Sequence, residues 1–217
     1  MWRYYAVALQ VRSQLNGGVP KSPAAIEAWI RTNIDGTSRL EQLIETTKQE
    51  IGSDKLTDAE VEALKSSCWN SFKFDDTGIY IEGRQVKAML KEAANVMKSV
   101  VDMTAFKARI AERVFVIDRK IYLGAAPTGS QEGVVHAMTA RGPISALKKS
   151  DYIKAPVVKF RLKVLDEKLK TKGGKFLQPG DYLGKILEMA SELGLGADRS
   201  QGYGTFDVVT LEEEIEE

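Results

Sequence analysis

Cysteine and histidine are nearly absent from this chain of 217 residues, which carries only Cys68 and His136. A lone cysteine excludes a disulfide within the chain, and the two residues together are too few for a structural zinc site. We therefore expect neither a metal nor another cofactor. Sparing use of cysteine is typical of proteins in a reducing compartment, which predicts a cytoplasmic location.

Long apolar runs are missing as well. No stretch approaches the roughly 18 consecutive apolar residues that a helix needs to cross a bilayer, so we expect no membrane partner. The first residues, Met1 to Tyr5, include neither a long apolar run nor a small-residue cleavage site, and we expect no secretory signal. Hydrophobic residues make up 43% and charged residues 28% of the sequence, which is typical of a globular protein.

A strong net charge is also missing. Lysine and arginine number 31 against 30 aspartates and glutamates, which gives a net charge of +1. Proteins that hold nucleic acid through its phosphates alone are usually more basic, so a nucleic-acid site here must arise from local clustering. Residues 212–217 are almost all glutamate, and we expect this acidic segment to be a solvated tail.

Two stretches, 2–12 and 157–165, alternate between apolar and polar residues and therefore predict strands. The polar side of the second stretch carries Lys159, Arg161 and Lys163. Three cations without an acid between them can meet several phosphates of a nucleic acid. The same pattern also fits the polar side of a half-exposed strand, so both interpretations stay open.

Two longer stretches repeat apolar residues at intervals of three and four and predict helices. They run over 83–101 and 178–194, and in the second Asp181 can cap the first turn while Gly194 ends the helix. The polar side of the first helix carries Arg84, Lys87 and Lys91. These cations are either phosphate contacts or an ordinary solvated helix face.

Two other stretches differ in character from these regular elements. Residues 13–78 combine glycine and proline breaks with three short helical patterns, which begin at Ala24, Ser38 and Thr57. Residues 124–154 open on a small, polar run over 124–133, which predicts a mobile loop or hairpin tip. We interpret 13–78 as a helical insertion and 124–154 as a hairpin insertion within a single domain, 1–217.

Without these insertions, the predicted order is strand, helix, strand, strand, helix, strand, and the last strand covers about 203–211. This is the βαββαβ order of the ferredoxin-like, or RRM-like, α+β fold. The helices of that fold cover one face of an antiparallel sheet and leave the other face open. We therefore predict a ferredoxin-like sheet with a helical insertion and a hairpin (thumb) insertion.

The segment that joins the second helix to the last strand is unusually rich in glycine, with Gly194, Gly196, Gly202 and Gly204. Glycine lets backbone amides approach a ligand closely, and consecutive amides can bind a phosphate. Arg199 adds a forked donor and Ser200 a hydroxyl. The segment is neither a Walker loop nor a dinucleotide fingerprint, because it follows a helix and precedes a strand. A helix cap followed by a tight turn, with no ligand, is the alternative explanation.

This glycine-rich segment resembles the loop of the RAMP superfamily, which reads glycine-apolar-glycine, a short polar stretch with a basic residue, and again glycine-apolar-glycine. Residues 81–91 are similar to the start of that family's first helix, where a glycine precedes a lysine and a leucine-basic pair. The order of elements looks most like the backbone subunits of CRISPR effector complexes, which have a helical insertion and a thumb. The resemblance implies a protein that binds RNA and assembles with copies of itself or with other subunits.

The first functional hypothesis is a non-catalytic, RNA-binding subunit of a CRISPR-type or related ribonucleoprotein that acts in antiviral defence. Its candidate contacts to single-stranded RNA are Gly194, Gly196, Arg199, Ser200, Gly202, Tyr203, Gly204, Arg84, Lys87, Lys91, Lys159, Arg161 and Lys163. The second hypothesis is a protein-interaction module, or a phage or mobile-element mimic of a CRISPR subunit, which the near-neutral charge favours.

A third hypothesis is a metal-independent RNA endonuclease. His136 is the only histidine available as a general acid or base, and Asp35 lies in a glycine-containing loop of the kind from which some RAMP nucleases cut RNA. No local motif supports either residue, so we assign no catalytic residue. Adjacent Asp75 and Asp76 are expected to form a turn rather than a metal site.

Aromatic residues are divided between two expectations. Tyr122 and Tyr203 can stack on bases, but aromatic residues at strand positions more often belong to the core, which we favour here. The tryptophans, Trp2, Trp29 and Trp69, are assigned to packing.

Overall fold

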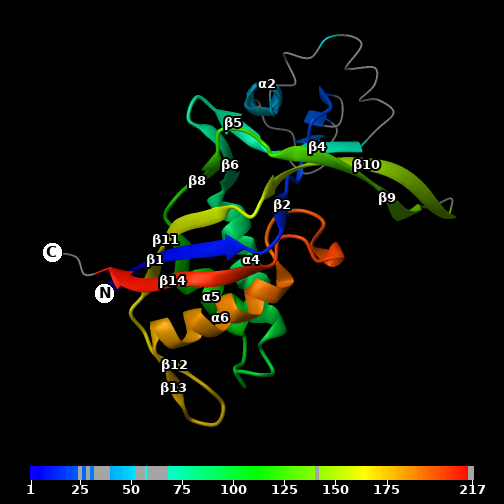
Figure 1. Ribbon diagram of the computed structural model, residues 1–217. Coiled ribbons are helices and arrows are strands. Elements are labelled where there is room, and N and C mark those ends of the chain that lie inside the picture. The colour runs from blue at the N-terminus through cyan, green and yellow to red at the C-terminus, as the bar shows by residue number, and fades with distance from the viewer. Residues whose placement is uncertain are drawn as a thin grey trace. The chain divides into compact units, whose positions relative to one another are not determined.

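The computed structural model describes residues 1–23, 26–27, 30–31, 40–51, 57, 68–139 and 142–214. The chain divides into two compact units (Figure 1). The first unit comprises residues 1–15, 81–123 and 154–217, and the second comprises residues 16–80 and 124–153. Among the described helices, none is long and apolar enough to cross a membrane.

The first unit is built on an antiparallel sheet with the strand order β14-β1-β11-β7. β1 (Trp2–Val11) is a central strand and pairs with β11 (Val157–Leu165) on one side and β14 (Phe206–Glu214) on the other. β7 (Val114–Val116) pairs with β11 and forms the opposite edge. The strands predicted from alternation over 2–12 and 157–165 are confirmed.

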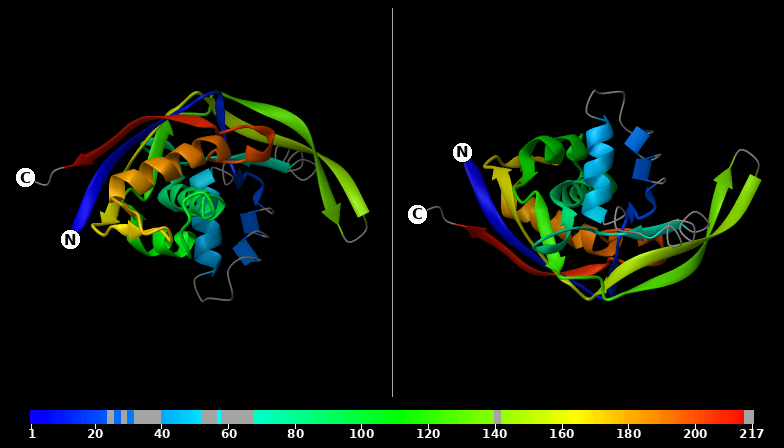
Figure 2. Two further views of the ribbon diagram at one scale, coloured as in Figure 1. Left: turned by 90° about the horizontal axis from the view of Figure 1, so that it is seen from below. Right: turned by 90° about the horizontal axis from the view of Figure 1, so that it is seen from above.

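One face of this sheet is covered by three helices, which Figure 2 shows on the same side. They are α4 (Gly83–Val96), α5 (Phe106–Arg113) and α6 (Pro179–Leu193). Alternate strand residues such as Leu9 and Leu162 are wholly buried beneath them. Burying these apolar side chains stabilises the sheet by about 25 cal/mol for each Å² removed from water. The polar residues of β1 and β11 consequently point to the uncovered face of the sheet.

The ends of the helices show which local signals decided their lengths. In α6 the carboxylate of Asp181 accepts the main-chain N–H of Gln178 at 3.1 Å, and Gly194 ends the helix with a φ of 77°, as predicted. The helix predicted over 83–101 is shorter than expected. α4 ends at Val96, although the apolar spacing in the sequence continues to Val101. Val100, at the end of that pattern, is 74% exposed. The sequence pattern therefore extended past the helix itself.

The second unit contains most of a sheet with the order β2-β10-β4-β3, to which β9 adds by pairing with β10. Its strands are β2 (Gln14–Asn16), β3 (Val19–Pro20), β4 (Cys68–Ser71), β9 (Gly129–Thr139) and β10 (Gly142–Lys154). β9 and β10 form a long antiparallel hairpin, with Gly129 opposite Tyr152 and Thr139 opposite Gly142. The strand β9 therefore begins at Gly129, inside the run 124–133 that was predicted to be a mobile loop or hairpin tip.

An apolar cluster accompanies this second sheet. Ile44 and Ile51 of α2 (Leu40–Ile51) are buried together with Ile26 and Ile30, and Val19 packs against them. The helix predicted to begin near Ser38 is thus confirmed from Leu40 onward. The patterns that begin at Ala24 and Thr57 fall partly or largely outside the described residues.

Two smaller sheets complete the described strands. One has the order β5-β6-β8, formed by β5 (Lys73–Asp75), β6 (Gly78–Glu82) and β8 (Lys120–Gly124). The other pairs β12 (Leu169–Lys170) with β13 (Phe176–Leu177). Between β5 and β6 the carboxylate of Asp75 accepts the main-chain N–H of Thr77 at 2.9 Å, which confirms the predicted turn.

The predicted fold class is wrong. The chain is a mixed α+β protein in which the described strands form four separate sheets rather than one ferredoxin-like βαββαβ sheet with insertions. The stretch 13–78, predicted to be helical, contributes strands β2 to β5 as well as α2. These strands are two to four residues long, which is too short to show the period of two that identified β1 and β11.

The described part of the acidic segment, residues 212–214, also differs from the prediction, while residues 215–217 lie outside the described residues. Glu212, Glu213 and Glu214 are not a solvated tail but belong to β14, where they lie opposite Ala6, Tyr5 and Tyr4 of β1. Glu213 accepts a hydrogen bond from Arg3 at 3.1 Å. Pairing with β1 satisfies the backbone N–H and C=O groups of these residues, so their side chains can stay exposed while the chain remains in the sheet.

Candidate nucleic-acid interface

The glycine-rich segment is closed on itself. The main-chain N–H of Leu195 donates to the carbonyl of Gly204 at 2.9 Å, and the N–H of Gly204 donates to Gln14 at 3.0 Å. The amides of Gly194 and Gly202 donate to Ala190 and Arg199, each at 2.9 Å. The N–H groups of Gly194, Gly202 and Gly204 are therefore engaged with carbonyls of the chain itself.

Close approach of two backbone stretches explains two of these glycines. A Cβ atom added at Gly204 would lie 1.8 Å from the carbonyl oxygen of Leu195, and one added at Gly194 would lie 2.8 Å from that of Tyr203. Gly202 faces open space but has a φ of 84°, which favours glycine. The geometry accounts for these residues by packing and turn formation, which was the alternative explanation from the sequence.

The polar residues of the same segment divide between pairing and exposure. Arg199 lies in the short 3-10 helix η2 (Arg199–Gln201), and its guanidinium is 2.8 Å from the carboxylate of Glu92 on α4. Ser200 is exposed and Tyr203 is half-buried. Glu92 neutralises the cation that the sequence offered for phosphate binding.

Lys87 is directed into the protein rather than toward solvent. Its ammonium group donates to the carbonyls of Ile110 at 3.0 Å and Ala111 at 2.9 Å, and also to that of Val114. Ile110 and Ala111 lie in the last turn of α5, where the carbonyl of Ile110 also accepts the N–H of Val114, so the lysine adds a second donor at the C-terminal end of this helix. Burial, and next the charge of Lys91, lower the pKa of Lys87 to about 8.

The other two cations of α4 are placed differently. Arg84 is mostly exposed and donates to the carboxylate of Glu82 at 2.8 Å. Lys91 is half-buried. The polar side of α4 therefore offers no continuous row of exposed cations among Arg84, Lys87 and Lys91.

Cations do gather on the uncovered face of the β14-β1-β11-β7 sheet. Lys159, Arg161 and Lys163 alternate along β11 with fully or nearly buried apolar residues, as the sequence predicted. Across the ladder they lie opposite Ala8, Ala6 and Tyr4 of β1. The strand pleat thus presents three positive charges on one side of the sheet.

Aromatic rings lie among these cations. The ammonium group of Lys163 is 4.9 Å from the ring centre of Trp2 and 5.8 Å from that of Tyr4. Trp2 meets Phe115 of β7 edge-on, with 5.7 Å between ring centres. Trp2 is 38% and Phe115 43% exposed, so the assignment of Trp2 to packing alone is incomplete.

An open hollow of about 560 Å³ lies beside this group of residues. Ala6 and Ala8 of β1 leave space above the sheet, and Lys159, Arg161 and Tyr122 are among the residues that line it. Tyr122 is 42% exposed, which is contrary to the expectation that it belongs to the core. Small side chains next to large ones on one face of a sheet create room for a planar ring.

Asp118 positions the strand that carries the central cation. Its carboxylate accepts the main-chain N–H of Arg161 at 2.6 Å, and its other oxygen is 3.6 Å from the guanidinium group. The Arg161 side chain remains 53% exposed. An arginine held in this way keeps donors available to a ligand in the hollow while its backbone is fixed.

The structure thus brings together one part of the predicted site and separates the rest. Lys159, Arg161 and Lys163 share the sheet face, whereas the glycine-rich segment and the α4 cations engage other parts of the first unit. Sequence reasoning missed Trp2, Tyr4 and Phe115, although Trp2 and Tyr4 stand on the polar side of the alternating stretch 2–12. That position was the available signal.

The residues considered for catalysis form no site in the described structure. His136 lies in β9 opposite Ser145, and Asp35 lies outside the described residues. In the part of the chain that the structure describes, no three metal-ligating side chains gather to hold an ion.

No known protein family matches the chain, and no curated protein is significantly similar to it.

Proposed function

We propose that the protein binds single-stranded RNA without cleaving it, through the uncovered face of the β14-β1-β11-β7 sheet. The observation that carries this proposal is the combination of three cations on β11 with exposed aromatic rings and an open hollow. We call the residues that form this surface the sheet face: Trp2, Tyr4, Phe115, Tyr122, Lys159, Arg161 and Lys163.

The chemistry of a single strand fits these groups. Unpaired bases stack on exposed aromatic side chains, and their phosphates are held by lysine and arginine. The hollow above Ala6 and Ala8 has room for one base, with Tyr122 and Arg161 at its border. A base is nearly neutral and a phosphate is anionic, so alternating rings and cations suit both parts of the ligand.

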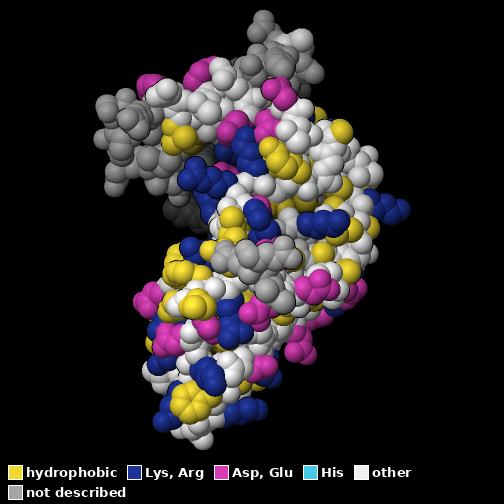
Figure 3. Space-filling view, turned by 90° about the vertical axis from the view of Figure 1, so that its left-hand side faces the viewer, with side chains coloured by type: hydrophobic (Ala, Val, Ile, Leu, Met, Phe, Trp, Pro, Cys, Tyr) yellow, Lys and Arg dark blue, Asp and Glu magenta, His cyan; other side chains and the backbone are white. Residues whose placement is uncertain are grey.

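The near-neutral charge of the chain agrees with a local site. On the side of the molecule that Figure 3 shows, Lys and Arg side chains lie among hydrophobic and acidic ones and form no continuous basic area. Binding through a few phosphates predicts moderate affinity that falls as salt rises, with a slope of about −0.7 for each contact to a single strand. In the proposed role, the protein acts as an RNA-binding subunit of a CRISPR-type or related assembly, with the sheet face rather than the glycine-rich segment in contact with the RNA.

The proposal is tested by measuring the affinity for a fluorescent oligouridine of about 15 nucleotides, a length within the range that one domain covers. The variant carries both Lys159→Ala and Lys163→Ala, and the matched control carries Lys98→Ala and Lys107→Ala, which remove two exposed cations on the helical side. We expect the first pair to weaken binding about tenfold and to lower the salt slope by about 1.4. The control pair is expected to have little effect.

A single further variant separates the sheet face from the glycine-rich segment. Arg199→Ala removes the ion pair with Glu92 but leaves the sheet face unchanged. We expect RNA affinity to change less than threefold, a change worth about 0.6 kcal/mol. Loss of binding in Arg199→Ala with none in the Lys159 and Lys163 variant would show that the sheet face does not hold the RNA.

A further inference from the structure

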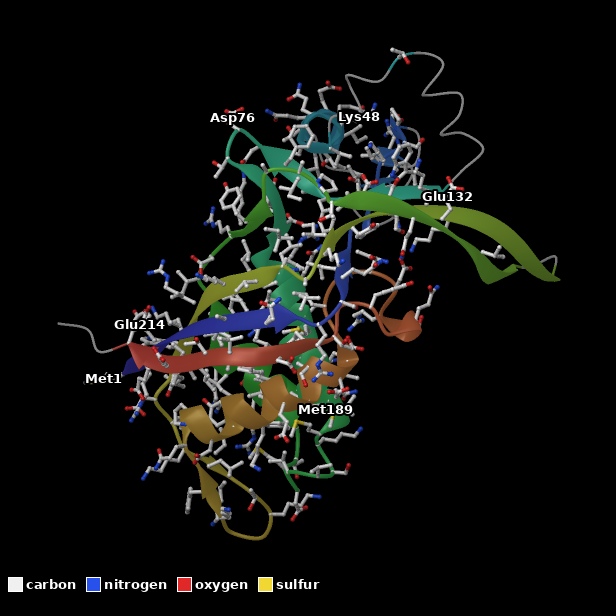
Figure 4. All side chains as sticks on the ribbon, viewed as in Figure 1. Met1, Lys48, Asp76, Glu132, Met189 and Glu214 are labelled. Atoms are coloured by element: carbon white, nitrogen blue, oxygen red, sulfur yellow. The ribbon has the colours of Figure 1, made fainter. Side chains whose placement is uncertain are left out.

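The hollow on the sheet face contains one acid among its cations. Of the described residues that line it, Lys120, Lys159 and Arg161 are cationic, and Asp118 alone is acidic. This acid is separate from the acidic border of the sheet, which is β14, where Figure 4 labels Glu214. β1 lies between β14 and the strand β11 that carries Arg161. A carboxylate therefore stands on the basic side of the sheet.

The position of Asp118 is fixed by two hydrogen bonds to the main chain of Arg161. Asp118 follows β7, and the N–H of neighbouring Ile117 donates to the carbonyl of Arg161 at 3.0 Å. One carboxylate oxygen of Asp118 accepts the N–H of Arg161 at 2.6 Å, and the other lies 3.6 Å from the guanidinium group. A carboxylate has about four lone-pair sites, so this hydrogen bond leaves acceptor capacity unused. The Asp118 side chain is 28% exposed, which lets a ligand reach it.

A carboxylate in this place selects the ligand atoms that contact it. It repels a phosphate, and it accepts hydrogen bonds but does not donate them. The guanidinium group of Arg161, which is 53% exposed, only donates. A ligand that contacts both side chains must therefore present a donor and an acceptor next to each other.

The Watson–Crick edges of three RNA bases meet this requirement. The amino group of cytosine donates to a carboxylate while its ring nitrogen and carbonyl accept from a guanidinium group. Adenine has an amino group beside a ring nitrogen, and guanine has an amino group and a ring N–H beside a carbonyl. Uracil has no amino group, and its one edge N–H lies between two carbonyl oxygens. One of these oxygens would lie close to the carboxylate of Asp118 and be repelled by it.

We infer that Asp118 and Arg161 make the hollow selective for an RNA base that carries an exocyclic amino group over uracil. The base lies above Ala6 and Ala8 with its Watson–Crick edge toward Asp118, and Tyr122 contributes an aromatic ring at the border. Asp118 is thus a specificity-determining residue, whereas the phosphates are left to the lysines of β11. The inference rests on the proposed function, because RNA must occupy the sheet face before a base enters the hollow.

The probes are two RNA oligonucleotides of about 15 nucleotides, one made of cytidine only and one of uridine only. They have the same charge and the same backbone, and both bases are pyrimidines, so they differ only at the edge that faces Asp118. The affinity of the full-length protein for each is measured by fluorescence anisotropy at constant salt. We expect the wild type to bind oligocytidine about tenfold more tightly, which is the discrimination typical of such base contacts.

Asp118→Asn isolates the effect of the carboxylate. The amide oxygen of asparagine still accepts the N–H of Arg161, while its NH₂ group can donate to a carbonyl of uracil. We expect the preference for oligocytidine to fall from about tenfold to less than about threefold. The matched control is Asp207→Asn, which removes an acid of β14 that does not line the hollow, and it should keep the preference. A purely structural role of Asp118, or a general effect of its charge, would change both affinities by the same factor.

Three results would overturn the inference. Equal affinities of the wild type for the two oligonucleotides exclude a preference among bases, and this comparison requires no variant. A preference that survives in Asp118→Asn places the selection elsewhere on the protein. Displacement of oligocytidine by free cytidine monophosphate at the same concentration would show that the hollow takes a free nucleotide rather than a base of RNA.

Failure of this inference is distinguishable from failure of the proposed function. If the two oligonucleotides bind equally, and Lys159→Ala with Lys163→Ala weakens both by the same factor, the sheet face holds RNA without a preference among bases. If neither oligonucleotide binds the wild type, the proposed function fails and the base preference fails with it.

Discussion

Trp69 of β4 donates its indole N–H to the carboxylate of Asp151 on β10 at 2.9 Å, inside the second unit. The other carboxylate oxygen accepts the hydroxyl of Ser71 at 2.6 Å, and Asp151 is only 6% exposed. Lys21 and Lys149 place their ammonium groups 4.0 Å and 3.9 Å from the centre of the Trp69 ring. One buried acid thus connects the strands β4 and β10 of this sheet.

Replacing that acid should destabilise the protein strongly. Asp151→Ala leaves the donors of Trp69 and Ser71 without an acceptor, and each buried unpaired donor costs about 1–3 kcal/mol. We expect the free energy of unfolding in urea to fall by about 3 kcal/mol. The matched control is Asp207→Ala, which removes an exposed ion pair with Arg12 and should cost less than about 1 kcal/mol. Equal effects of the two substitutions would contradict this role of Asp151.

Two glycines of the glycine-rich segment form a second matched pair. Gly204 and Gly202 have φ values of 76° and 84°, so alanine pays a similar backbone cost at both, about 1–3 kcal/mol. Only at Gly204 does the added Cβ meet the Leu195 carbonyl. We expect Gly204→Ala to lower the urea midpoint clearly more than Gly202→Ala does. Equal midpoints would mean that the two backbone stretches are not in close contact.

Lys87 should make stability depend on pH in the alkaline range. Its pKa is lowered from 10.5 to about 8, mainly by burial, so the unfolded chain holds this proton more tightly than the folded protein. Below about pH 8 both states are protonated and the contribution is constant. Between about pH 8 and 10.5 the unfolded state binds more protons, so the contribution of Lys87 to the free energy of unfolding rises with pH.

The measurement compares the wild type with Lys87→Met by urea denaturation across that range. Near pH 7 the variant should be less stable by about 1–3 kcal/mol, because the carbonyls of Ile110, Ala111 and Val114 lose the hydrogen bonds from the ammonium group. The stability difference between wild type and variant should then grow from about pH 8 upward. A difference that shrinks with rising pH would show that the folded protein holds this proton more tightly than the unfolded chain.

Filling the hollow on the sheet face should weaken RNA binding without changing the charge. Ala8→Leu places a larger side chain where we propose that a base stacks, and a stacked base is worth about 1–3 kcal/mol. We expect about tenfold weaker binding of oligouridine at constant salt, with the salt slope unchanged. The control is Ala88→Leu at an exposed position of α4, which should leave affinity unchanged. A larger loss of oligouridine affinity in the control than in Ala8→Leu would contradict the placement of the base.

The sequence predicted the first unit better than the second. β1, β11, α4 and α6 are nine residues or longer and bury one side, so a period of two or of three to four is visible in their residues. The helix α5 was missed because only Phe106 and Ile110 among its eight residues are buried, which leaves almost no periodic pattern. Pairing of short strands such as β3 and β4 depends on distant partners, which local patterns cannot reveal.

The candidate site shows the same limit. Alternation along 157–165 correctly predicted that Lys159, Arg161 and Lys163 share one exposed face. Local patterns could not show that Arg199 meets Glu92, because these two residues are distant in the sequence. Nor could they show that Lys87 caps α5, because that helix was not predicted. A lysine on the polar side of a helix looks the same whether it points to water or to a carbonyl.

The pairing of residues 212–214 with β1 gives the sheet face a direction. Glu212 and Glu214 stand opposite Ala6 and Tyr4, which in turn stand opposite Arg161 and Lys163. Charge along this row therefore runs from negative on β14, through uncharged β1, to positive on β11. A polyanion crossing the face would be repelled at one border and attracted at the other, so it would run parallel to the strands on the β11 side.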